Sequence, residues 1–353
     1  MRELLVGEIF NMKILSIDTS CDETSVAVTE GTKILSNVIW SQASAHAKFG
    51  GVMPSLAQRM HEERIDWIIE KALKSAKLKI DDIDVIAVTI GPGLSIALGV
   101  GIDRAKKLAI KYNKKLIAVN HLEGHILSSL ANSKFDILNS KFPMFGLVVS
   151  GGNTLLIKIN QIGEYEVLAQ TVDDALGEAL DKGARMLGLG YPGGAVMEKI
   201  ARGGDLKSYK LPIPIVGQES RKIFTYSGLK TSFSRLTAVE KPLTKEKIQN
   251  LAACFQDVSF KHLIRVCSYV IKNSEFKISN LLVGGGVSAN IELRKRLRKL
   301  CKENEITVAF PYSKKLTGDN AAMIGIAAYY KASRNGYISP DIIDRSPNLK
   351  INQ

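Results

Sequence analysis

The chain has 353 residues, which is long for one average domain and suits two domains that each bury a core of their own. Hydrophobic residues make up 45% and charged residues 24%, so the composition excludes a largely disordered chain. No uncharged apolar run of about 18 residues occurs, and the sequence therefore predicts no membrane span. Lys and Arg outnumber Asp and Glu by 48 to 35, which indicates either an anionic macromolecular partner or solvated helix faces rich in lysine.

The first residues and the cysteines bear on the compartment. Residues 1–11 include Glu3 and Glu8 and lack a long apolar run, so we expect an N-terminal extension that adds little to the fold and is no secretory signal. The cysteines show no C-x-x-C spacing, which favours reduced thiols in a cytoplasm over a disulfide framework or a zinc site. They are Cys21, Cys254, Cys267 and Cys301.

Short β-branched runs alternate with helical patterns along the chain. The predicted strands are Lys13–Ile17, Thr24–Thr29, Val85–Thr89, Leu116–Val119, Phe145–Val149, Thr154–Ile159, Leu281–Val283 and Thr307–Phe310. The predicted helices are Glu62–Leu78, Ile102–Tyr112, Asp174–Leu187, Lys245–Asn273 and Asn320–Ser333. Two hairpins resemble each other, each with a polar loop, at residues 18–23 and 150–153. This repetition predicts two related domains of mixed sheets flanked by helices, packed around a cleft.

A histidine pair gives the sharpest chemical signal. His121 and His125 are four positions apart, so on a helix their imidazoles share one face and can share one metal ion. Polarity of a helix surface is the alternative explanation of such a pair. The zinc-protease pattern H-E-x-x-H does not fit, because Glu123 stands two positions after His121 and lies about 160° around the helix from His125.

Three glycine-rich loops adjoin predicted strands or helix starts, where backbone amides can approach a phosphate closely. They are Ser150-Gly151-Gly152, Pro192-Gly193-Gly194 and Gly284-Gly285-Gly286. The presence of three such loops in one chain favours a nucleotide-binding site. The third loop also satisfies the dinucleotide pattern G-x-G-x-x-A, but that pattern needs an acid after the next strand, where Pro311 and Tyr312 stand instead.

Acidic residues form two further candidate ligand-binding groups. Asp174, Glu178 and Asp181 share one stripe of a predicted helix, which amphipathicity explains without a function. Gly177 and Gly183 flank these acids and would suit the close approach of a ligand. Asp319 precedes the last predicted helix, where it could be either an N-cap or a ligand.

From Met12 onward the motifs resemble, in order, those of the TsaD family, the universal tRNA threonylcarbamoyladenosine synthase subunit once classed as a glycoprotease. The matching segments are residues 17–24, 46–61 and 91–94, His121 to His125, 150–154, 173–182, 191–194, 227–231, 284–290 and 318–320. The resemblance implies an α/β fold of two ribonuclease-H-like domains, as in the actin-like and sugar-kinase ATPase superfold, around a central cleft. It places the first domain at residues 12–140 plus 320–353 and the second at 141–319.

The resemblance also implies site residues. His121, His125 and Asp319 match the family's metal ligands, generally for iron as Fe²⁺. The positions that match the family's threonylcarbamoyl-adenylate site are Val148, Val149, Ser150, Gly151, Gly152, Asp181, Gly194 and Asn290. No catalytic residue is assigned beyond the metal site.

The implied reaction transfers the threonylcarbamoyl group to N6 of adenosine 37 in tRNAs that read codons starting with A, and releases AMP. The implied partners are tRNA, the adenylate-forming enzyme and the bacterial subunits TsaB and TsaE. Two rival functions are a metal-dependent glycoprotein endopeptidase and a noncatalytic ATP-dependent scaffold.

Three positions depart from the family pattern. Asn153 stands where many relatives have His and cannot ligate or titrate as His does. Ser55 stands where bacterial relatives often have Glu, and Tyr226 replaces the usual Phe.

Overall fold

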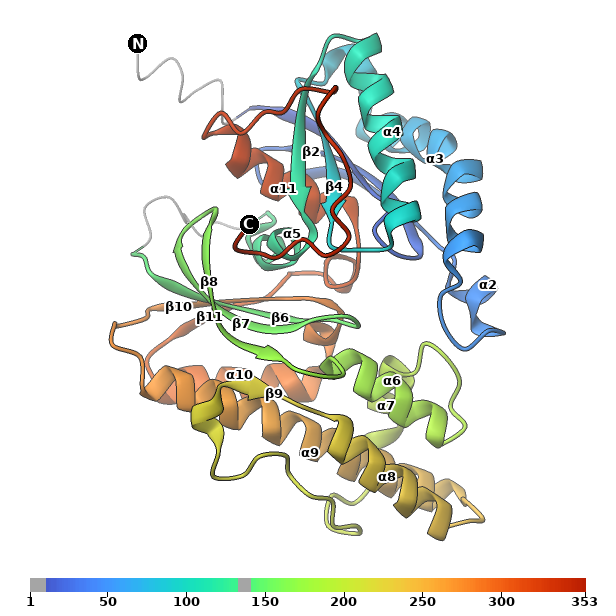
Figure 1. The fold of residues 1–353 in the computed structure, drawn as a ribbon, viewed down its shortest axis with the longest axis vertical. Coiled ribbons are helices and arrows are strands. Elements are labelled where there is room, and N and C mark those ends of the chain that lie inside the picture. Colours follow the sequence, from blue (N-terminus) through green and yellow to red (C-terminus); the bar gives the residue numbers. More distant parts are fainter. Residues whose placement is uncertain (1–10, 133–140) are drawn as a thin grey trace. The chain divides into compact units, whose positions relative to one another are not determined.

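The structure is a computed structural model that describes residues 11–132 and 141–353. The extension expected at residues 1–11 therefore lies, apart from Asn11, outside the described residues. Contacts divide the chain into two compact units (Figure 1), one of Met1–Ser140, Ile162–Glu164 and Phe310–Gln353, the other of Lys141–Gln161 and Tyr165–Ala309. Among the residues that the structure describes, no helix is both long and apolar enough to cross a membrane.

The first unit is built on a five-stranded sheet in the order β3-β2-β1-β4-β5. Its strands are β1 (Lys13–Asp18), β2 (Glu23–Glu30), β3 (Lys33–Ser41), β4 (Val85–Gly91) and β5 (Lys115–Asn120). β2 is antiparallel to β1 and to β3, whereas β4 is parallel to β1 and to β5. The carboxyl ends of β1, β4 and β5 therefore open at one edge of the sheet.

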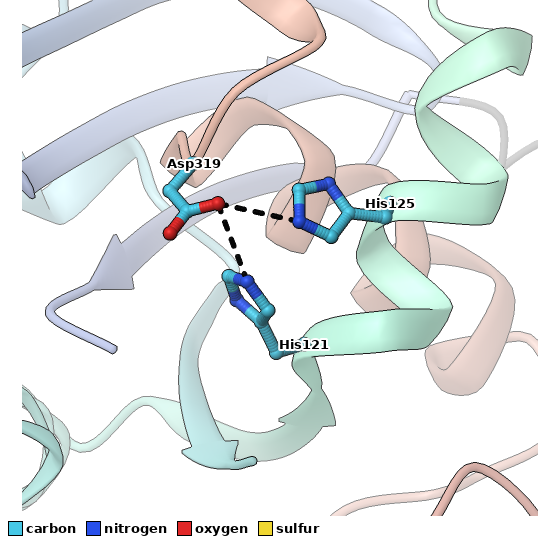
Figure 2. Close-up of side chains that lie close together, drawn as sticks. All are labelled: His121, His125 and Asp319. Atoms are coloured by element: carbon cyan, nitrogen blue, oxygen red, sulfur yellow. Dashed lines mark ion pairs between the residues drawn. The ribbon is translucent and has the colours of Figure 1, made fainter. Parts of the chain in front are cut away.

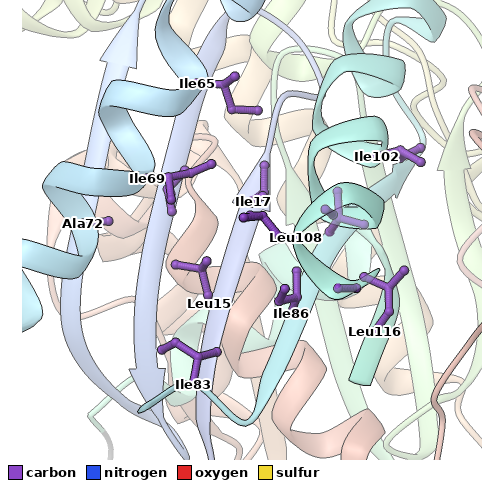
Figure 3. Close-up of a cluster of buried hydrophobic side chains, with 14 of the residues drawn as sticks. Leu15, Ile17, Ile65, Ile69, Ala72, Ile83, Ile86, Ile102, Leu108 and Leu116 are labelled. Carbon is purple, nitrogen blue, oxygen red and sulfur yellow. The ribbon is translucent and has the colours of Figure 1, made fainter. Parts of the chain in front are cut away.

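The helices of the first unit are α2 (Ala43–Ala47), α3 (Pro54–Ala76), α4 (Ser95–Lys111), α5 (His121–Leu127) and α11 (Ala321–Ala332). α3 and α4 pack on one face of the sheet, where aliphatic side chains at helical spacing meet those of the strands (Figure 3). Ile65, Ile69 and Ala72 supply this face of α3, and burial of each isoleucine side chain stabilises the fold by about 1.5–3 kcal/mol. α11, which is buried along nearly its whole length, contacts β1, β2 and α5.

The second unit repeats the strand order in β8-β7-β6-β10-β11, with β9 added at the edge beyond β8. The strands are β6 (Met144–Val149), β7 (Thr154–Gln161), β8 (Glu164–Thr171), β9 (Ile223–Phe224), β10 (Asn280–Gly284) and β11 (Thr307–Ala309). The helices are α6 (Leu176–Met186), α7 (Gly194–Ala201), α8 (Ser227–Val239), α9 (Lys245–Lys272) and α10 (Ile291–Glu303). As in the first unit, the opening hairpin is antiparallel and the later strands are parallel.

The duplicated sheet order confirms the predicted α/β fold of two ribonuclease-H-like units. Contacts place residues 162–164 and 310–319 with the first unit, whereas we expected them in the second. The reason is local: Arg334 of the first unit donates to the Ile162 carbonyl, and Asn132 Nδ2 donates to Tyr312 Oη at 2.9 Å. The domain boundaries and the central cleft stay predictions.

Candidate metal and nucleotide sites

Helix α5 carries the histidine pair, and its start is fixed by its N-cap. The side chain of Asn120, the last residue of β5, accepts a hydrogen bond from the Leu122 N–H at 2.9 Å. This cap starts the helix at His121, which brings His121 and His125 onto one face. All seven residues of α5 are buried, which excludes a solvated helix surface as the reason for the pair.

Asp319 lies just before α11, and its carboxylate points toward the two imidazoles (Figure 2). The N-cap of α11 is Asn320, whose side chain accepts from the Met323 N–H at 3.2 Å. The alternative in which Asp319 caps this helix is therefore wrong, because the side chain of the next residue, Asn320, caps it. Close packing of α5 on α11 brings the three side chains together, since a Cβ added to Gly124 would lie 3.0 Å from Ile324 Cδ1.

The distances within this group fit one metal ion. Asp319 Oδ1 lies 3.4 Å from His121 Nε2 and 3.3 Å from His125 Nε2, and one ligand atom from each residue lies within 4.8 Å of the others. Ligand atoms about 2.1 Å from an ion, at angles of about 90–109°, would be about 3.0–3.4 Å apart. Both ring nitrogens of His125 are buried with no hydrogen-bond partner in the described part of the chain. Two imidazoles and one carboxylate with unused lone pairs form a suitable donor set.

Asp18, at the carboxyl end of β1, lies behind this group. Its side chain is fully buried, and its Oδ1 is 3.8 Å from His121 Nδ1, the ring nitrogen that faces away from Asp319. At this distance Asp18 and the His121 ring interact through charge and not through a hydrogen bond. The sequence analysis did not assign Asp18 a role, although its place in the polar loop after the first strand was a signal.

The electrostatics of the group follow from burial and from these carboxylates. Burial lowers the pKa of His121, but Asp319 and Asp18 outweigh it and raise that pKa to about 10. Burial lowers the pKa of His125. Burial raises the pKa of Asp319, yet the two histidines bring it below its usual value. The pocket thus favours positive charge beside Asp319, which is what a cation would supply.

Further acids lie on the loop between β1 and β2. Burial, then the charges of Asp319 and Asp22, raise the pKa of Glu23 to about 9. Burial, followed by Asp22 and Asp319, also raises the pKa of the Cys21 thiol. The loop therefore places its side chains within electrostatic reach of Asp319.

The second unit contains a pocket of about 250 Å³ to which all three glycine loops contribute. Of the expected adenylate-site residues it is lined by Gly151, Asp181, Gly194 and Asn290. The others do not line it: Val148 and Val149 are buried in β6, and neither Ser150 nor Gly152 reaches the lining. Glu198 lines the pocket as well and was missed, because a single acid on a short helix gives no motif.

Asp181 shapes this pocket from α6. Its Oδ1 accepts hydrogen bonds from the backbone amides of Gly193 and Gly194 at 2.9 and 2.7 Å, so it fixes the start of α7. Burial raises the pKa of Asp181, while the two amides oppose that rise. The amide cradle around the pocket is open, because a Cβ added at Gly151 or Gly286 would meet nothing within 4 Å.

The two glycines that flank the acids of α6 both allow close packing within the protein. A Cβ on Gly177 would lie 2.5 Å from the Ser150 carbonyl oxygen, and one on Gly183 would lie 2.7 Å from Phe255 Cε1. Gly183 serves packing within the protein and does not line the pocket, so the interpretation as an approach for a ligand is wrong at that position. Gly177 lets α6 rest on the glycine loop after β6 and also lines the pocket, so its role in the close approach of a ligand stays a prediction.

A family model described as "tRNA N6-adenosine threonylcarbamoyltransferase" matches residues 33–326, which include the metal-binding group and the pocket. The chain belongs to the TsaD family. It is 42% identical to the protein of that name from Thermosipho africanus, over 96% of this chain and 100% of the relative. It is 43% identical to the one from Clostridium kluyveri, over 97% and 99%. Membership of the TsaD family makes the chain a transferase.

Solved structures support the fold of this TsaD-family chain. Component A of (R)-2-hydroxyglutaryl-CoA dehydratase from Acidaminococcus fermentans aligns with a TM-score of 0.53 at 14% identity, over 91% of this chain and 99% of that one. HypF in its phosphate- and nucleotide-bound form aligns with a TM-score of 0.55 at 14% identity, over 92% of this chain and 47% of that one. At such low identity these likenesses show the fold of the actin-like ATPases alone.

Proposed function

We propose that this chain transfers the threonylcarbamoyl group from threonylcarbamoyl-adenylate to N6 of adenosine 37 in tRNAs that read codons starting with A. The main support is that a family match over residues 33–326 coincides with a buried group of two histidines and one aspartate. In this reaction N6 attacks the carbonyl carbon, a C–N bond forms, the bond from that carbon to the phosphate oxygen breaks, and AMP leaves as N6 gives up a proton.

His121, His125 and Asp319 would hold one divalent ion, and we propose Fe²⁺. When bound, such an ion supplies positive charge that polarises a carbonyl or stabilises a leaving phosphate. The chain's own contribution is to keep each of the two Nε2 atoms 3.3–3.4 Å from Asp319 Oδ1 before the ion binds. The charge of Asp18, 3.8 Å from His121 Nδ1, would favour this placement of the ring.

The pocket of the second unit would hold the adenylate. Asp181 can accept hydrogen bonds from ribose hydroxyls, and the open glycine positions at Gly151 and Gly286 leave room for a phosphate against bare amides. We keep Val148, Val149, Ser150 and Gly152 in the proposed site as residues of the strand and loop that carry Gly151. Asn290 lines the pocket, and its side chain is fixed by Gln256 and by the Leu293 amide.

tRNA is the proposed macromolecular substrate, and the net charge of +13 suits it. Two basic stretches, residues 294–299 and 314–315, are candidates for phosphate contacts: Lys295, Lys314 and Lys315 are exposed, whereas Arg296 is paired with Asp257 and Glu292. Phosphate contacts by exposed lysines would give binding that weakens with salt. We further propose TsaB, TsaE and an adenylate-forming enzyme as partners, and the cytoplasm as the compartment.

The peptidase alternative is not favoured. It would need an acid beside the metal as general base, and Glu123 is buried within α5 without being part of the metal-binding group. The test combines the protein with threonine, bicarbonate, ATP, the adenylate-forming enzyme, the partner subunits and unmodified tRNA. Mass spectrometry of the nucleosides should detect threonylcarbamoyladenosine with the wild type and not with Asp319→Ala. Metal-dependent cleavage of a glycoprotein without any modified nucleoside would contradict the proposal.

A further inference from the structure

The loop between β1 and β2 lies against the metal-binding group, with Asp18 at its start and Glu23 at its end. Asp18 faces His121, and the charge of Asp319 acts on Cys21 and Glu23. Acids crowded so close to Asp319 disfavour this arrangement of the loop, and the raised pKa of Glu23 reflects the crowding. The conformation of the loop therefore depends on contacts made from other elements.

His61 of α3 supplies two of these contacts. Its Nε2 lies 3.0 Å from the Cys21 carbonyl oxygen, and its Nδ1 lies 2.8 Å from Thr24 Oγ1. A carbonyl can only accept, so Nε2 carries the hydrogen and Nδ1 accepts from the Thr24 hydroxyl. One neutral ring thus joins the middle of the loop to the start of β2.

The hydrophobic core fixes this ring in place. His61 and Thr24 are fully buried. His61 lies in the buried stripe of α3, one turn after the buried Ala57 and one turn before Ile65, and the stripe continues with Ile69 and Ala72, which pack on the sheet in Figure 3. A side chain within such a stripe has little freedom to move.

A second brace supports the same loop from the segment before α3. The Gln42 N–H donates to the Asp22 carbonyl at 2.9 Å, and Gln42 Nε2 donates to the Ala57 carbonyl, one turn before His61, at 3.3 Å. His46 Nε2 lies 3.0 Å from Gln42 Oε1 and holds that amide in place. The loop is thus tied to α3 through Cys21, Asp22 and Thr24.

We propose that His61 is a positioning residue, which fixes the loop of Cys21, Asp22 and Glu23 beside the metal-binding residues and so sets the turnover of the enzyme without touching substrate. The effect on turnover is predicted on the basis of the proposed function. A buried histidine that only fills the core is the competing explanation, and it predicts a loss of stability with no specific effect on the metal group or on turnover.

The variants separate the two hydrogen bonds. His61→Ala removes both, Thr24→Val removes the hydroxyl with little change of volume, and His61→Gln keeps an amide donor near the position of Nε2. The matched control is His262→Gln, which alters a buried histidine of the second unit, away from this loop. Each protein is purified, its thermal midpoint is measured, and it is loaded with Co²⁺ in place of the native ion.

The readouts are the visible absorption spectrum of the Co²⁺ protein, and kcat and KM for tRNA in the transfer assay. We expect His61→Ala and Thr24→Val to lower kcat at least tenfold and to leave KM within twofold. They should also shift the Co²⁺ bands, because displacement of Cys21, Asp22 and Glu23 changes the charge around Asp319. His61→Gln should restore part of kcat. His262→Gln should change the thermal midpoint but neither kcat nor the spectrum.

Wild-type kcat and an unshifted spectrum in Thr24→Val and His61→Gln would overturn the inference, even if His61→Ala did not fold. A wild-type protein that modifies no tRNA would instead contradict the proposed function. In that case the Co²⁺ spectra of the same variants would still decide the role of His61.

Discussion

His262 makes the stability of the protein depend on pH in a way that can be calculated. It lies in α9 with 1% of its surface exposed, and its Nε2 accepts a hydrogen bond from the Thr225 N–H at 3.1 Å. The rings of Phe224 and Tyr226 pack edge-on against it. Burial lowers the pKa of His262 to about 4, although the charge of Asp173 opposes this. The ring is therefore neutral in the folded protein at neutral pH.

The sign of the effect follows from proton binding. In the unfolded chain His262 has an ordinary pKa of about 6.5, so below that pH the unfolded state binds more protons than the folded state. The stabilisation is complete above pH 6.5 and is lost as the pH falls toward 4. With these two pKa values the loss at pH 5 is about 2 kcal/mol, and at most about 3.4 kcal/mol at still lower pH.

The assay is urea unfolding of the wild type and His262→Gln at pH 7.5 and pH 5.0. Other groups titrate in both proteins, so the quantity to compare is the change in unfolding free energy between the two pH values. The wild type should lose about 2 kcal/mol more than the variant. An equal loss in both proteins would refute the argument that His262 is held neutral by burial.

Three further changes test the two sites. His125→Ala should remove most of the bound metal, measured by elemental analysis of purified protein, and a wild-type metal content would refute the ligand assignment. Gly194→Trp should abolish adenylate binding in calorimetry whereas Gly194→Ala should not, because a Cβ there lies 3.4 Å from Asp181 Oδ1, an ordinary contact. Gly177→Ala should cost about 1–3 kcal/mol in urea unfolding, because its Cβ would overlap the Ser150 carbonyl. Gly228→Ala, whose methyl meets nothing within 4 Å, is its control and should cost less than 0.5 kcal/mol, about the limit for surface changes.

Most strands and the duplicated hairpins could be predicted from the sequence because their β-branched runs have no competing pattern, but β3, β8 and β9 were missed. The helices α7, α8 and α10 were missed as well, and the starts of two other helices were wrong. α3 begins at Pro54, eight residues before the predicted start at Glu62, because its first turns are polar and only the proline marks them. α4 begins at Ser95 and not Ile102, because Gly99 and Gly101 weaken the local helical preference that packing overrides.

The histidine pair was predictable because its two members lie one helical turn apart. The third member needed the fold or a family resemblance, since Asp319 is remote in sequence and capping was the commoner fate of such a residue. Asp18 had only its place in the polar loop as a signal and His61 had none, because their roles arise from contacts between elements that are far apart in the sequence. Likewise three glycine loops suggested a nucleotide site, but only the structure shows that they line one pocket.

The most direct test of the central claim follows one carbon atom. Synthetic threonylcarbamoyl-adenylate labelled in its carbamoyl carbonyl is mixed, in a single turnover, with the protein, its partner subunits and unmodified tRNA carrying adenosine or guanosine at position 37. We predict that the label enters only the adenosine tRNA, with one AMP released per label transferred, and that Asp319→Ala abolishes both. Release of AMP without labelled tRNA, or equal labelling of the guanosine tRNA, would contradict transfer to N6 of adenosine 37.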